Sequence, residues 1–84
     1  MRTSEQRTWR IRSTRDLGRA IADIRSIRGL TQQQLADGTT TPRAYLAKLE
    51  AGLTIGMIER VLRLLRRMGA EVTVSLNRES DAEG

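Results

Sequence analysis

The chain has 84 residues, 38% of them hydrophobic, and contains neither cysteine nor histidine. Their absence excludes disulfides, Cys/His metal sites and catalysis that depends on either side chain, so we expect no enzyme, no cofactor and no metal. Fifteen basic residues, fourteen of them arginine, stand against ten acidic ones and give a net charge of +5. This excess favours an anionic partner, with nucleic acid ahead of a membrane.

The short length limits the core. A chain of this size buries only about 60% of its unfolded surface, so we expect oligomerisation to supplement a thin core. No apolar run approaches the roughly 18 residues of a transmembrane helix, and no apolar segment follows the N-terminus as in a signal peptide. These features predict a cytoplasmic protein without a membrane span.

Two capping patterns open the first two predicted helices. Ser13 is a favourable N-cap with Asp16 three residues later, and apolar residues then recur at helical spacing until a glycine at position 29. The pattern predicts a helix over residues 14–28. Thr31 and Gln34 form a second capping box, which opens a short helix that we expect to end at Gly38.

Two further helices follow. Thr41 is the expected cap of the third helix, with Pro42 in the first position, where its missing N–H costs nothing. Gly52 closes this helix. The fourth helix is predicted over residues 55–68, and its apolar residues, Leu64 among them, cover more than one side.

The end of the chain changes to a period of two. Val72, Val74 and Leu76 alternate with polar residues, which predicts a half-buried strand over residues 70–76. Weaker alternation over residues 8–12 indicates an extended arm or a short strand. A lone strand leaves its backbone groups unpaired, so its partner is either this segment or the same strand of a second chain. The wide apolar surface of the fourth helix favours the second alternative, a homodimer with contacts from Leu64, Val72, Val74 and Leu76.

The second and third predicted helices are short and joined by a tight connector, as in a helix-turn-helix. The major groove of B-DNA admits one α-helix, and the N-terminal residues of the second helix of the pair reach the base edges. Arg43 suits bidentate contact with guanine, and Ala44 and Ala47 are small enough to meet a thymine methyl group. Tyr45 can pack on a sugar or bond a phosphate, and Lys48 lies one turn further on.

The pattern Leu30-Thr31-Gln32, Leu35-Ala36, Leu46, Leu49-Glu50, Gly52 resembles the Xre/Cro-like family of helix-turn-helix repressors. Within that family, residues 13–76 resemble the HipB-type antitoxins. The resemblance implies a mostly α, lambda-repressor-like domain of four helices, with a C-terminal strand that pairs across a dimer. It leaves residues 1–12 as a basic N-terminal arm and residues 77–84 as a polar, acidic tail.

The resemblance also implies roles for individual residues. Gln32 would contact a DNA backbone phosphate, and Arg25 and Glu50 would form a structural salt bridge between the first and third helices. The sequence departs from the family in the connector, where Thr40 stands in place of the usual glycine and Pro42 in place of the usual Ser or Thr cap. The connector geometry is therefore less defined than the helices beside it.

We expect a transcriptional repressor that binds a palindromic operator as a homodimer, acting as an antitoxin that regulates its own operon. A HipA-like kinase toxin as protein partner is implied by the resemblance alone. Two alternatives stay open: a phage or mobile-element repressor without a toxin, and a protein-interaction module that uses the fourth helix. Trp9 is expected to be a core plug or dimer contact rather than a base-stacking residue.

Overall fold

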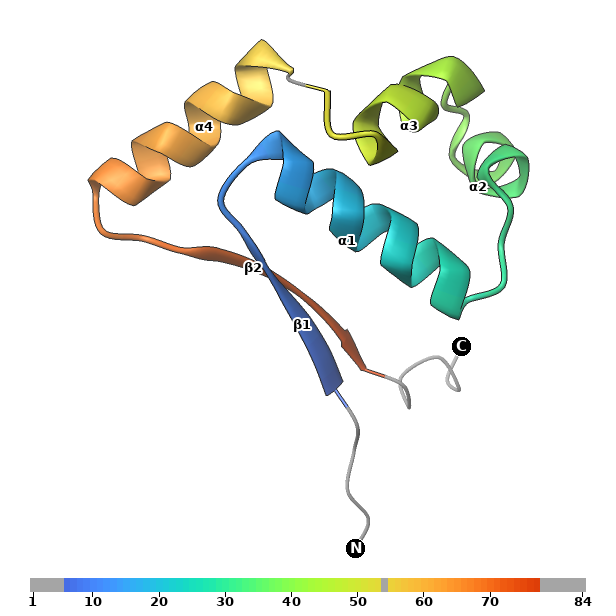
Figure 1. The fold of residues 1–84 in the computed structure, drawn as a ribbon, viewed down its shortest axis with the longest axis horizontal. Helices are drawn as coiled ribbons and strands as arrows, with labels where there is room; N and C mark the ends of the chain where they lie inside the picture. The colour runs from blue at the N-terminus through green and yellow to red at the C-terminus, as the bar shows by residue number, and fades with distance from the viewer. Residues whose placement is uncertain (1–5, 54, 78–84) are drawn as a thin grey trace, which may run out of the picture.

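The computed structural model describes residues 6–53 and 55–77. The elements run β1 (Gln6–Ile11), α1 (Thr14–Ile27), α2 (Gln32–Thr39), α3 (Arg43–Glu50), α4 (Gly56–Arg67) and β2 (Val72–Asn77). In Figure 1, α2 and α3 lie on one side of the molecule and α4 on the other, while the two strands run beside α1. Within the described residues, four helices and a small antiparallel sheet confirm the mostly helical fold class, and the expected pairing of the C-terminal strand across a dimer stays a prediction. The expectations for residues 1–5 and 78–84 lie outside the described residues.

Local signals set where α1 and α2 begin. The hydroxyl of Ser13 accepts the N–H of Asp16 at 3.2 Å and caps α1. The capping box of α2 is complete, because Thr31 Oγ1 accepts the N–H of Gln34 at 3.0 Å and Gln34 Oε1 accepts the N–H of Thr31 at 2.8 Å. These bonds satisfy backbone donors that the first turn of a helix leaves free.

The connector between α2 and α3 differs from the expectation. The helix α2 continues past Gly38 to Thr39, and Thr40 then takes a left-handed conformation with φ 55°. This is the position where the resembled family usually has glycine, and a β-branched residue is strained there. Thr41 does not cap α3: its hydroxyl bonds the carbonyl of Thr39 at 3.3 Å, and Pro42 occupies the N-cap position without a side-chain cap bond.

The strand β2 finds its partner within the chain. It pairs antiparallel with β1 in a two-stranded sheet, in a register that places Trp9 opposite Val74 and Ile11 opposite Val72. The sequence left two possible partners for β2. In the structure, the partner on this edge comes from the same chain, in the region of the predicted segment of residues 8–12. This corrects the preference for a second chain. The opposite edge of β2 has no strand beside it among the described residues.

The main core lies between the sheet, α1 and α4. Ile11, Ala20 and Leu62 are its buried residues, and Trp9, Leu17, Ile58, Val72 and Val74 pack against them. Trp9 Nε1 donates to Asp23 Oδ2 at 2.9 Å, so the single polar atom of the indole is hydrogen-bonded to α1. The alternation of β2 is as predicted, because Val72 and Val74 face this core. A consequence is that both valines, predicted as dimer contacts, pack within their own chain.

The helix α4 is tied to the start of α1. Glu59 Oε2 accepts the backbone N–H of Thr14 at 2.7 Å. This bond holds the pKa of Glu59 below its ordinary value, because a hydrogen bond donated to the ionised carboxylate favours its charged form.

Candidate nucleic-acid interface

The outer side of α3 is built by the helical period. Leu46 is buried against the rest of the domain, and Leu49 and Glu50 are half-buried on the same side. At 3.6 residues per turn, Ala44 and Lys48 lie on the side away from Leu46, whereas Arg43 is exposed because it stands at the start of the helix. The residues referred to below as the outer face of α3 are Arg43, Ala44, Tyr45, Ala47 and Lys48, all exposed except half-buried Ala47.

The outer face of α3 carries two cations without a counter-ion. Neither Arg43 nor Lys48 forms an ion pair with any residue in the described part of the chain. Arg43 also begins the helix, where the first-turn N–H groups receive no side-chain cap and the helix dipole is positive. Two small alanines between the cations let a surface approach closely. The face therefore has the charge, donors and low relief that a helix needs to enter the major groove.

A partly buried ion pair fixes α3 to α1. Arg25 Nε donates to Glu50 Oε2 at 2.8 Å, and its Nη2 donates to Glu50 Oε1 at 3.0 Å. The side chain of Glu50 is 7% exposed and that of Arg25 is 21% exposed. The bonds from Arg25 lower the pKa of Glu50, and its burial opposes them with a smaller effect. Arg25 and Glu50 thus occupy the structural positions that the resemblance implied.

Gln32 lies at the first turn of α2, beside this ion pair. Its Nε2 donates to Glu50 Oε1 at 3.0 Å, which makes Glu50 the common acceptor for α1 and α2. The sequence reading assigned Gln32 to a phosphate and missed this bond. An amide nitrogen carries two hydrogens, so Gln32 can hold Glu50 with one and donate to a phosphate with the other. Glu50 thereby orients the side chain of Gln32 as well as α3 itself.

The helices α1 and α3 also touch through their backbones. A Cβ atom added at Gly18 would lie 2.0 Å from the carbonyl oxygen of Leu49 and 3.2 Å from the Cα of Glu50. Only glycine permits this approach. The sequence reading did not single out Gly18, although an isolated glycine inside a helical pattern is a signal of close packing. The C-terminal end of α3, at Leu49 and Glu50, is therefore held against α1 by the close approach at Gly18 and by the Arg25–Glu50 pair.

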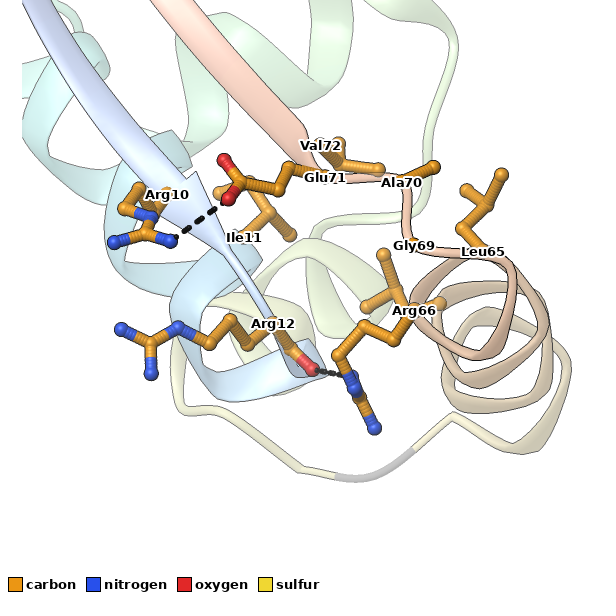
Figure 2. A pocket seen from close by; sticks show the side chains of 10 residues that line it. Arg10, Ile11, Arg12, Leu65, Arg66, Gly69, Ala70, Glu71 and Val72 are labelled. Carbon is orange, nitrogen blue, oxygen red and sulfur yellow. Dashed lines mark hydrogen bonds and ion pairs between the residues drawn. The ribbon is translucent and has the colours of Figure 1, made fainter.

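A cavity of about 490 Å³ lies at the far end of the sheet, between β1, β2 and the C-terminal turn of α4 (Figure 2). Two of its three arginines have partners within the chain: Arg10 Nη2 pairs with Glu71 Oε2 at 3.1 Å, and Arg66 donates to the backbone carbonyl of Arg12. These contacts join the end of α4 to the sheet. Arg66 thereby has a structural contact at the C-terminal end of α4.

Comparison with known proteins gives one match. The model of the helix-turn-helix family HTH_3 matches residues 21–74, which include all of α2 and α3. The chain belongs to this family. No curated protein and no solved structure matches it. Membership makes the protein a DNA-binding transcriptional regulator and places the outer face of α3 in the family's helix-turn-helix.

No helix among the described residues has the length and apolar character needed to cross a bilayer. No group of three or more carboxylates in the same residues is placed to hold a metal ion.

Proposed function

We propose that the protein is a transcriptional repressor that binds a palindromic operator through the outer face of α3. The observation that carries the proposal is the pair of exposed cations on α3, Arg43 and Lys48, which have no ion-pair partner among the described residues. The helix itself is fixed to the domain by the Arg25–Glu50 pair. Arg43 reads guanine, Ala44 and Ala47 meet thymine methyl groups, and Tyr45 contacts the sugar-phosphate backbone.

The proposed repressor is a homodimer. A two-fold dimer places two α3 helices in successive major grooves, about 34 Å apart, and this spacing matches a palindromic site. The uncovered edge of β2 supports a strand-mediated interface, because pairing with the same edge of a second chain would join two small sheets into one of four strands. Leu76, half-buried near the end of β2, lies at such an interface. Val72 and Val74 contribute through their backbone, since their side chains face the core.

We further propose that the repressor is an antitoxin that regulates its own operon, with a HipA-like kinase toxin as its partner. The support is the resemblance of residues 13–76 to HipB-type antitoxins. A kinase-like gene next to the coding sequence would support this reading, and a phage or mobile-element setting without one would favour a repressor that has no toxin.

Footprinting on the DNA upstream of its own gene tests the proposal. We expect two protected half-sites one helical turn apart. Since phosphate contacts release counter-ions, apparent affinity should fall by roughly a hundred-fold or more between about 50 and 200 mM salt. Protection of a single unpaired site would contradict the dimer. Absence of any protected site at low salt, with random DNA bound equally well, would contradict sequence-specific repression.

A further inference from the structure

The helix α4 is apolar on its solvent side as well as on its core side. Met57, Val61, Leu64 and Met68 are 77%, 47%, 58% and 72% exposed. Their spacing of four, three and four residues places them in one stripe along the helix. We refer to these four residues as the α4 stripe. They are separate from Leu62, which is buried, and Ile58, which packs on the core.

The α4 stripe has the character of a docking surface. Large apolar side chains that gather on one face of a small soluble domain mark interaction sites more often than scattered ones do. A methionine at each end adds adaptable, polarisable contacts, which are common where a surface receives a helix. Of the four residues of the α4 stripe, only Leu64 was predicted from the sequence as a dimer contact. The exposed apolar stripe on α4 therefore includes three residues beyond that prediction.

Arginines border the stripe on the side away from the core. Arg60, Arg63 and Arg67 are exposed and surround Leu64 in a shallow depression. None of the three forms an ion pair with a carboxylate among residues 6–53 and 55–77. The one acidic residue of α4, Glu59, is bonded to the Thr14 backbone N–H. The border of the stripe is therefore uniformly positive.

This charge pattern disfavours a second copy as the occupant. An antiparallel two-fold contact of the stripe with itself brings Arg60 of one chain beside Arg67 of the other, twice in each dimer. Like charges placed side by side across an interface are unfavourable, and carboxylates in the same positions would be favourable.

We propose that the α4 stripe docks an amphipathic helix of a partner protein, one that carries glutamates or aspartates beside its own apolar stripe. The apolar residues supply the contact area, and Arg60, Arg63 and Arg67 select for acidic flanks. The proposal rests on α4 alone and does not depend on DNA binding by α3. It assigns Leu64 to this surface and leaves the proposed dimer to β2.

The test uses the full chain and two synthetic helical peptides with the same leucine stripe, one with glutamate flanks and one with lysine flanks. We expect the glutamate peptide to bind at least about ten-fold more tightly, with NMR shifts confined to residues 57–68. Arg60→Glu with Arg67→Glu should reverse the preference. The control Arg43→Glu with Lys48→Glu makes the same change in net charge on α3 and should leave the lysine peptide weakly bound.

Three results would overturn the proposal. The first is equal binding of both peptides, or shifts outside α4. The second is that Val61→Gln with Leu64→Gln turns a dimer into a monomer, which would identify a second copy as the occupant. The third is binding to phosphatidylglycerol vesicles that the same double variant abolishes and the glutamate peptide does not compete with. Operator footprinting of the Gln variant should be unchanged, so failure here is distinct from failure of the repressor proposal.

Discussion

Replacing Gly18 with alanine is expected to lower the free energy of unfolding by about 3 kcal/mol. The new Cβ would stand 2.0 Å from the Leu49 carbonyl oxygen, an atom of the α3 backbone that cannot rotate away. The two helices must separate, and the Arg25–Glu50 pair that spans them must stretch. Urea denaturation followed by circular dichroism measures the loss.

Gly38→Ala is the matched control. Gly38 is also helical, but nothing lies within 4 Å of an added Cβ there. Alanine at that position should raise the free energy of unfolding by about 0.5–1 kcal/mol, because it lowers the entropy of the unfolded chain and favours the helix. If Gly18→Ala were as stable as the control, α1 and α3 would not be in the contact described.

The second large effect concerns Glu50. Its removal in Glu50→Ala should lower the free energy of unfolding by about 2 kcal/mol, since it frees the donors of Arg25 and Gln32 at once. Arg25→Met should be worse, because it leaves a carboxylate that is 7% exposed without its counter-ion. The double variant Arg25→Met with Glu50→Leu should recover much of that loss, since no buried charge remains.

Because the pKa of Glu50 is lowered in the folded protein, the stabilisation by the ion pair should depend on pH. The folded protein lowers that pKa below its ordinary 4.5, so the ion pair contributes its full stability above about pH 4.5. The contribution disappears as the pH falls through the lowered pKa, when the folded protein takes up the proton. The difference in unfolding free energy between wild type and Glu50→Gln should therefore shrink with acid below pH 4.5. A difference independent of pH would contradict the ion pair.

Much of the fold could be predicted from the sequence because its signals are local. Capping residues and helical spacing place α1 and α4 to within one or two residues, and alternation identifies β2. The conformation of the connector was harder to predict, because Thr40 is left-handed and threonine rarely adopts that conformation. The partner of β2 was missed for a different reason. Residues 8–12 alternate weakly, and pairing across more than 60 positions depends on the tertiary core.

Which residues contact DNA stays a prediction. Of the contacts that hold α3, the Arg25–Glu50 pair was expected, whereas the bond to Gln32 and the contact at Gly18 were not. Helical spacing places Lys48 on the side of α3 away from Leu46, and Arg43 is exposed at the start of the helix. The link between Gln32 and Glu50 depends on how three helices meet, which periodicity does not encode. The same holds for Gly18, whose importance lies in a backbone approach from a residue 31 positions later.

Operator affinity of an α3 variant tests the central claim most directly. Fluorescence anisotropy on the footprinted site would compare Arg43→Ala with Lys48→Ala against a control of equal charge loss on α4, Arg63→Ala with Arg67→Ala. The account predicts about a hundred-fold loss of affinity for the α3 variant, because base and phosphate contacts are both removed, and a loss of only a few-fold for the control. Equal losses in the two variants would contradict recognition by α3.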